Sequence, residues 1–236
     1  MLKFAPILLA VLYGLVMYQL SAWRTRRALD RHSTELLDTP LKALTDRMAA
    51  ALGIERIRVH LYEVAPVNGL ATPDGRIFIT RGFYNTYRSG NISAQEMASV
   101  IAHELGHVAL GHTRRRMIDF SGQNAVRVVL ATVLGRLIPG IGGWVGGWIA
   151  QAATALLMAR LSRQDEYAAD AYASALLVKA GIGTTPQKTL FRKLETLGGM
   201  GGRGILAWLM SHPSTRNRIA AIEALEARWA RKLPPG

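Results

Sequence analysis

The hydrophobic pattern first predicts a small sheet in the first half of the chain. Residues 56–64 (RIRVHLYEV) alternate apolar and polar side chains, which is the period of a strand with one buried face. Residues 68–84 (NGLATPDGRIFITRGFY) give a short extended piece, a turn at Pro73–Gly75, and a second strand with Ile77 and Ile79 on one face. We therefore expect a hairpin in this region.

Most of the remaining pattern has a helical period. Residues 39–52 are typical of an amphipathic helix, and Ser93 with Glu96 forms a capping box that opens another helix. The apolar residues that share one face of this second helix are Met97, Ile101, Leu105 and Val108. Further helices are expected within residues 162–181, 186–197 and 211–229. The predicted fold class is α+β, mainly helical, with one small sheet.

Two long apolar runs stand outside this pattern. Residues 4–23 carry no charge and number 20, about the length of a spanning helix. A cleaved signal peptide is the alternative, but no cleavage site of small residues is evident. We therefore expect a transmembrane anchor over residues 1–23 and a basic linker over residues 24–38. The second run, residues 126–159, is either a buried part of the main domain or a membrane-dipping or lid segment.

Composition and charge narrow the choice of partners. Half of the 236 residues are hydrophobic, and the net charge is +13. Such a basic chain binds either nucleic acid or an anionic lipid membrane. Nucleic acid is not expected, because no binding motif accompanies the charge. The chain has no cysteine, which excludes disulfides and thiolate metal ligands.

A pair of histidines on the capped helix indicates metal chemistry. His103 and His107 are four residues apart, so they differ by about 40° around a helix and can share one cation. Imidazole nitrogen is a good zinc ligand. Glu104 is turned by about 100° from His103, beside the metal, where a general base for the attacking water belongs.

A catalytic zinc needs a third protein ligand, and two residues compete for this role. His112 lies five residues beyond the HELGH motif, about 140° around the helix, so we expect it to support the site or to end the helix. Metzincin spacing is excluded, because Leu110 and Thr113 occupy the positions of its glycine and histidine. Glu166 is preferred, because Asp170 shares its helix face and can hold a ligating histidine.

These motifs resemble the membrane-associated zinc metallopeptidases of the HtpX and CAAX-prenyl-protease type, which are gluzincins. The resemblance covers roughly residues 40–230, and its motifs are HELGH (103–107), SRQDEYAAD (162–170) and SHPSTRNRI (211–219). A weaker match, residues 68–80, has Gly69 and Asp74 where the family has alanine and glycine. That difference affects the expected substrate-binding strand more than catalysis.

The resemblance implies a zincin-like metalloprotease domain over residues 39–232, with one zinc ion per chain. It implies that zinc is bound by His103, His107 and Glu166. It also implies that Glu104 is the general base and that Asp170 holds a ligating histidine without binding the metal itself.

By the same resemblance, His212 lies near the metal and Arg218 is its partner in the motif. His212 would either stabilise the oxyanion or occupy the open zinc position in a latent state. The alternatives are a turn residue for His212 and a surface arginine for Arg218.

The shared zinc also limits the second apolar run. His107 and Glu166 must meet at one ion, so the chain between them starts and ends on the same side of any membrane. Two crossings need some 40 apolar residues or more, and residues 126–159 provide only 34. The run therefore packs on the domain or dips into lipid as a hairpin.

The leading hypothesis is a membrane-anchored zinc metalloendopeptidase that cleaves unfolded or membrane-proximal proteins in protein quality control. An edge strand near residues 76–80, with Ile77, Phe78 and Ile79, would hold the polypeptide substrate by β-augmentation. The alternative is a proteolytically silent zinc-bound membrane chaperone or scaffold, although neither the base nor a ligand is lost. The expected location is a bacterial-type cell membrane. The arginines of residues 24–31 favour a cytoplasmic catalytic domain, whereas relatives with one N-terminal apolar segment are often exported.

Overall fold

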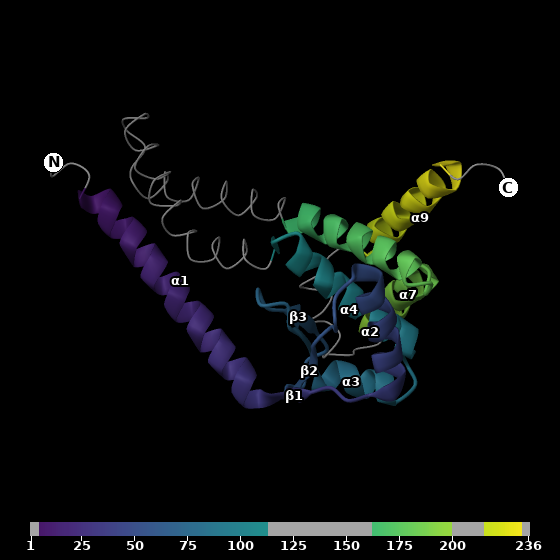
Figure 1. Cartoon of the computed structure of the whole chain (residues 1–236), viewed down its shortest axis with the longest axis horizontal. Helices are drawn as coiled ribbons and strands as arrows, with labels where there is room; N and C mark the ends of the chain where they lie inside the picture. Colours follow the sequence, from purple (N-terminus) through teal and green to yellow (C-terminus); the bar gives the residue numbers. More distant parts are fainter. Residues whose placement is uncertain (1–4, 113–161, 200–214, 233–236) are drawn as a thin grey trace. The chain divides into compact units, whose positions relative to one another are not determined.

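The computed structural model describes residues 5–112, 162–199 and 215–232. Contacts within the chain divide it into two compact units. One unit comprises residues 1–31 and 114–164, and the other comprises residues 32–113 and 165–236. The second unit contains the sheet (Figure 1), and the residues of the candidate site also belong to it.

The N-terminal segment is helical well beyond the apolar run. Helix α1 (Ala5–His32) includes the basic residues after position 23, and strand β1 (Ser33–Glu35) follows directly, so much of the expected linker is regular structure. Within the three described ranges, no helix is long and apolar enough to cross a membrane. The transmembrane helix of the predicted fold class is not confirmed. The apolar run 126–159 lies outside the described residues.

The sheet has four short strands, in the order β1-β2-β4-β3. Strands β2 (Val59–Tyr62), β3 (Gly69–Ala71) and β4 (Ile77–Thr80) fall within the stretches whose pattern predicted them. Strands β3 and β4 form the expected antiparallel hairpin, and β2 pairs in parallel with β4. Gly75, with φ of +82°, supplies the left-handed turn residue that a side chain would disfavour.

The prediction that β4 forms an edge strand is wrong. Strand β4 lies between β2 and β3, and all four of its residues are buried. Ile77 and Ile79 belong to the hydrophobic core, while Phe78 stacks on His60 at a ring-centroid distance of 5.2 Å. The free edge beside the hairpin belongs to β3, because β3 pairs only with β4 among the described strands. Ile77, Phe78 and Ile79 are therefore core residues.

Four of the described helices begin at residues suited to that position. Asp38 accepts the Leu41 amide at the start of α2 (Thr39–Leu52), and Thr80 accepts the Phe83 amide at the start of α3 (Arg81–Arg88). The predicted capping box opens α4 (Ala94–Ala109). Helix α7 (Thr185–Gly199) has Pro186 near its start, where its fixed φ suits a helix. The other described helices are residues 162–179 and α9 (Thr215–Lys232).

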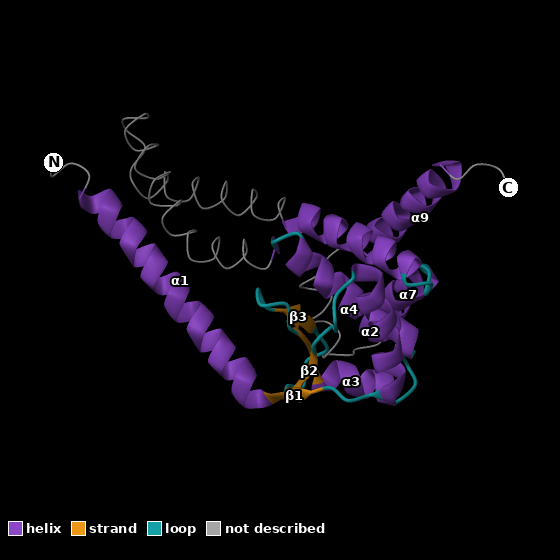
Figure 2. Cartoon of the chain, viewed as in Figure 1, coloured by secondary structure: helices purple, strands orange, loops and turns teal. Residues whose placement is uncertain are grey.

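The core of the second unit places α4 between the sheet and the later helices. Helix α4 contacts strands β3 and β4 and packs on α2 and α7, and Figure 2 shows β3 beside it. A Cβ at Gly106 would lie 2.9 Å from the Ala169 carbonyl oxygen. Glycine therefore lets the backbones of α4 and residues 162–179 touch. This contact brings the HELGH motif against the residues around Glu166.

Candidate metal centre

Three predicted ligands meet inside the second unit. His103 and His107 come from α4, Glu166 comes from helical residues 162–179, and all three are buried. Their ligand atoms lie within 4.8 Å of one another. The two Nε2 atoms are 3.1 Å apart, and the Glu166 carboxylate oxygens lie 3.3 Å and 3.4 Å from them. The structure thus forms a group able to hold a metal ion.

The donor set fits zinc. Two imidazoles and one carboxylate are the ligands of a common catalytic zinc type, with zinc–ligand distances of about 2.0–2.2 Å. Ligands at that distance in a tetrahedron lie about 3.3–3.5 Å from one another, close to the spacings in this group. Three protein ligands also leave the fourth position open.

A buried ion network lies behind His103. Its Nδ1 is 2.9 Å from Asp170 Oδ1, and Arg218 donates to both Asp170 oxygens at 2.6 Å and 2.7 Å. Burial alone would raise the pKa of Asp170, but the Arg218 charge and hydrogen bonds lower it to about 2. Burial alone would lower the pKa of His103, but Asp170 and Glu166 raise it to about 9. The site therefore favours a positive charge at the position of the metal, and metal binding displaces this proton.

Glu104 lies next to the ligand group and is buried. Its Oε1 has no hydrogen-bond partner among the residues that the structure describes. Strand β3 approaches it closely, since a Cβ on Gly69 would lie 3.3 Å from that oxygen. A buried carboxylate oxygen without a protein partner is suited to bind and deprotonate a water molecule.

Several residues of the site have no clear signal in the sequence. The side chain of Gln187 lies 3.4 Å from Asp170 and accepts a hydrogen bond from Ser174. The Arg218 guanidinium lies 4.3 Å from the centre of the Phe191 ring. Gln187 and Phe191 come from α7, whose pattern predicts a helix but not which helix it packs against. Ser174 is the one of these residues whose place near the site helical spacing could have indicated, because it lies one turn after Asp170 on the same helix.

The other predicted site residues have different outcomes. Arg218 is buried in the network and is not a surface arginine. His212 lies outside the described residues.

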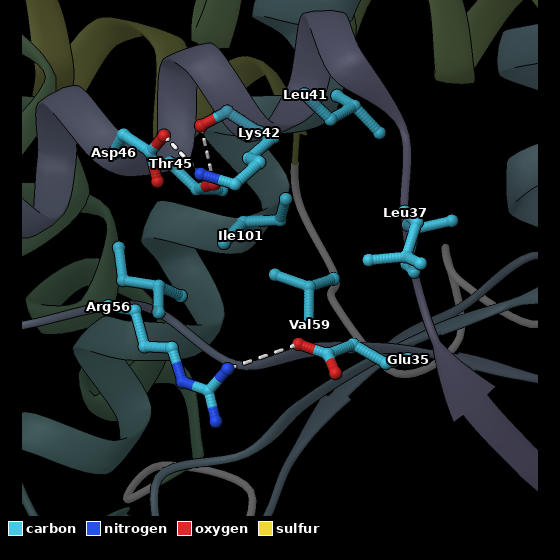
Figure 3. A pocket seen from close by; sticks show the side chains of 11 residues that line it. Glu35, Leu37, Leu41, Lys42, Thr45, Asp46, Arg56, Val59 and Ile101 are labelled. Carbon is cyan, nitrogen blue, oxygen red and sulfur yellow. Dashed lines mark hydrogen bonds and ion pairs between the residues drawn. The ribbon is translucent and has the colours of Figure 1, made fainter.

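A separate cavity of about 100 Å³ is lined by Leu41, Val59 and Ile101, with a Glu35–Arg56 ion pair at its side (Figure 3). That cavity contains none of the metal-binding group.

A histidine pair on one helix, with a carboxylate from a second helix and a buried glutamate beside them, defines a zinc metallopeptidase. The profile of peptidase family M48 matches residues 35–226, and the chain belongs to this family.

Several curated proteins are similar to the chain. The chain is 30% identical over 216 residues to "Protease HtpX homolog" of Bordetella avium, covering 80% of this chain and 70% of that protein. It is 29% identical over 157 residues to "Metalloprotease LoiP" of Escherichia coli, covering 66% of this chain and 59% of that protein. It is 24% identical over 198 residues to "Metalloendopeptidase OMA1, mitochondrial" of Homo sapiens, covering 78% of this chain and 36% of that protein.

Proposed function

We propose that the chain is a membrane-attached zinc metalloendopeptidase that hydrolyses unfolded or membrane-proximal polypeptides. The observation that carries the proposal is Glu104, which follows the ligand His103 on α4 and whose buried Oε1 has no hydrogen-bond partner among the described residues. Family membership supports the peptidase activity. No observation favours a proteolytically silent scaffold, because the base and the three ligands are all present.

The chemistry divides between the metal and the chain. Zinc, when bound by the three ligands, polarises the scissile carbonyl and acidifies the attacking water. Glu104 accepts the proton of that water and then gives it to the leaving amine. Asp170 and Arg218 keep His103 oriented with Nε2 toward the metal position.

Strand β3 replaces β4 as the proposed substrate strand. Antiparallel pairing directs alternate residues toward the partner strand. The Thr80 amide bonds the Asn68 carbonyl, and the Thr72 amide bonds the Arg76 carbonyl. The backbone groups of Gly69 and Ala71, between these bonded positions, therefore point to the opposite edge, which no described strand covers. An extended substrate that added there would run past Glu104.

Membrane attachment is the part of the proposal that rests on α1. The exposed large apolar residues of this helix include Leu12, Tyr13, Leu15 and Val16, each 54–64% exposed. Arginines follow at positions 24, 26, 27 and 31. An apolar helix bordered by cations suits an anionic lipid surface.

His212 keeps both of its proposed roles, because it lies outside the described residues. A role at the oxyanion and an inhibitory metal contact have opposite consequences. The activity of a His212→Ala variant decides between them, since it falls in the first case and rises in the second.

The decisive test replaces the base without changing its size. We expect Glu104→Gln to retain zinc and to lose roughly 10²–10⁴-fold in peptide hydrolysis, because an amide cannot take the proton of water. Casein hydrolysis and metal content are measured on the purified zinc-loaded protein. Glu63→Gln, which changes an exposed carboxylate paired with Arg81, is the matched control and keeps full activity. Substantial hydrolysis by the Glu104→Gln variant with normal zinc content would falsify the mechanism.

A further inference from the structure

The second histidine of the metal group contacts another buried histidine on its far side. His107 Nδ1 lies 3.1 Å from His112 Nδ1, and His112 Nε2 lies 3.3 Å from Asp165 Oδ1. All three side chains are buried. The contacts form a line from the metal position through His107 and His112 to a carboxylate.

The end of α4 explains why His112 reaches this place. Helical geometry would direct His112 about 140° away from His107. The helix ends instead at Ala109, Leu110 is its C-cap, and Gly111 follows with φ of +70°. This left-handed residue reverses the chain, so His112 folds back toward the helix that it would otherwise extend.

The position of Asp165 follows from that of Glu166. Neighbouring helical residues point about 100° apart, so residues 162–179 present Glu166 to the metal position and Asp165 to His112. The helix of residues 162–179 therefore supplies both a metal ligand, Glu166, and the carboxylate that contacts His112, Asp165.

A metal at His107 would select the tautomers of the two imidazoles in this line. It would take the lone pair of His107 Nε2, so that the ring proton would reside on Nδ1. His107 Nδ1–H then donates to His112 Nδ1, which leaves the His112 proton on Nε2 and directs it to Asp165. A neutral His112 is the only state in which it can accept from His107 and donate to Asp165 at once.

We propose that His112 and Asp165 are positioning residues that hold His107 in its zinc-binding tautomer and orientation. The proposal rests on the zinc site described above. The two ligating histidines are then supported differently: His103 contacts a carboxylate directly, whereas His107 reaches one through a second imidazole.

The test measures zinc affinity by competition with a chelator, using the purified full-length chain. Outer partners of ligating histidines typically contribute a factor of roughly 10–100 to metal affinity, and we expect a loss of this size for His112→Ala. His112→Asn restores an oxygen acceptor near the position of Nδ1, so most of the affinity returns. Asp165→Asn keeps an oxygen acceptor and gives a smaller loss than His112→Ala.

His60→Ala is the matched control, because His60 stacks on Phe78 in the sheet, away from the metal group. We expect it to keep the zinc affinity of the wild type. The proposal is overturned if His112→Ala binds zinc as tightly as the wild type, or if His112→Asn restores nothing. A wild-type chain that binds zinc but cleaves no peptide counts against the proposed peptidase and leaves the affinity comparison intact. A wild-type chain that binds no zinc overturns both.

Discussion

At the residue scale, the two ring nitrogens of each ligating histidine have different roles. Nε2 of His103 and of His107 converges on the metal position, while each Nδ1 meets a buried partner. The spacing of the histidines indicates the first task, because a helix brings residues four apart to one face. The partners come from distant parts of the chain or, for His112, from a reversal at Gly111, which helical spacing does not reveal.

Arg218 carries the largest stability effect that we expect from a single side chain at the site. It is 1% exposed and neutralises the buried Asp170 carboxylate. Removing one partner of a buried ion pair leaves an uncompensated charge and typically costs about 3–5 kcal/mol. We expect a loss of this size for Arg218→Met in urea unfolding of the metal-free protein.

Arg216→Met is the control for this prediction. Arg216 is on the same helix, its side chain is 87% exposed, and its ion pair with Glu195 lies in solvent. Its replacement changes stability little. Equal effects of the two substitutions would contradict the buried role of Arg218. Replacing Asp170 by leucine in the Arg218→Met variant removes the second charge and recovers part of the loss.

At the element scale, periodicity and end signals predicted strands β2, β3 and β4 and most of the helices, but not strand β1 or helix α3. Apart from the β3–β4 hairpin, they did not predict which elements are neighbours. The start of α4 and the bounds of α2 follow from local residues, namely the Ser93–Glu96 capping box and the Asp38 cap with Gly53 after the last turn. Strand order depends on pairing between distant segments. The alternation in residues 76–80 therefore predicted a strand, while the parallel partner that places β4 in the interior had no local signal. The contact at Gly106 is likewise visible only once two helices are placed together.

The capping box of α4 makes the stability of this element dependent on pH. Burial alone would raise the pKa of Glu96, but hydrogen bonds from Lys193 and the Ser93 amide lower it below its usual value. A carboxyl group whose pKa is lower in the folded state stabilises the fold above its unfolded pKa of about 4.3. That contribution is lost as pH falls through the folded pKa.

We therefore expect Glu96→Gln to reduce the free energy of unfolding at pH 7 by about 0.5–2 kcal/mol. The difference from the wild type shrinks as pH falls below about 4. Urea unfolding at several pH values, with a chelator present so that metal release does not contribute, measures both. A difference that stays constant down to pH 3 would show that the ionised carboxylate is not the stabilising form.

At the scale of the whole molecule, the peptidase family covers residues 35–226, and all of α1 precedes it. The described metal-site residues belong to the second unit, whereas α1 up to Arg31 belongs to the first. The sequence predicts that the N-terminal apolar run and the metal motif are separate, because a long uncharged run and a metal motif have distinct local patterns. It could not predict how residues 126–159 are used, because both packing on the domain and dipping into lipid satisfy the same hydrophobic pattern.

Deletion of residues 1–23 distinguishes the contributions of the two apolar runs. We expect the full chain to bind neutral and anionic vesicles even in high salt, because apolar burial of α1 is not screened. The deletion variant retains Arg24 and its neighbours and the run 126–159, whose charges are Arg127 and Arg136. It should therefore bind anionic vesicles most strongly at low ionic strength, since attraction between exposed charges is screened over about 10 Å at 0.1 M salt. Apolar insertion of residues 126–159 would leave weaker binding in high salt. Vesicle sedimentation at low and high salt gives the comparison. A deletion variant that ignores vesicles under every condition would assign the proposed membrane attachment to residues 1–23 alone and would count against lipid insertion by residues 126–159.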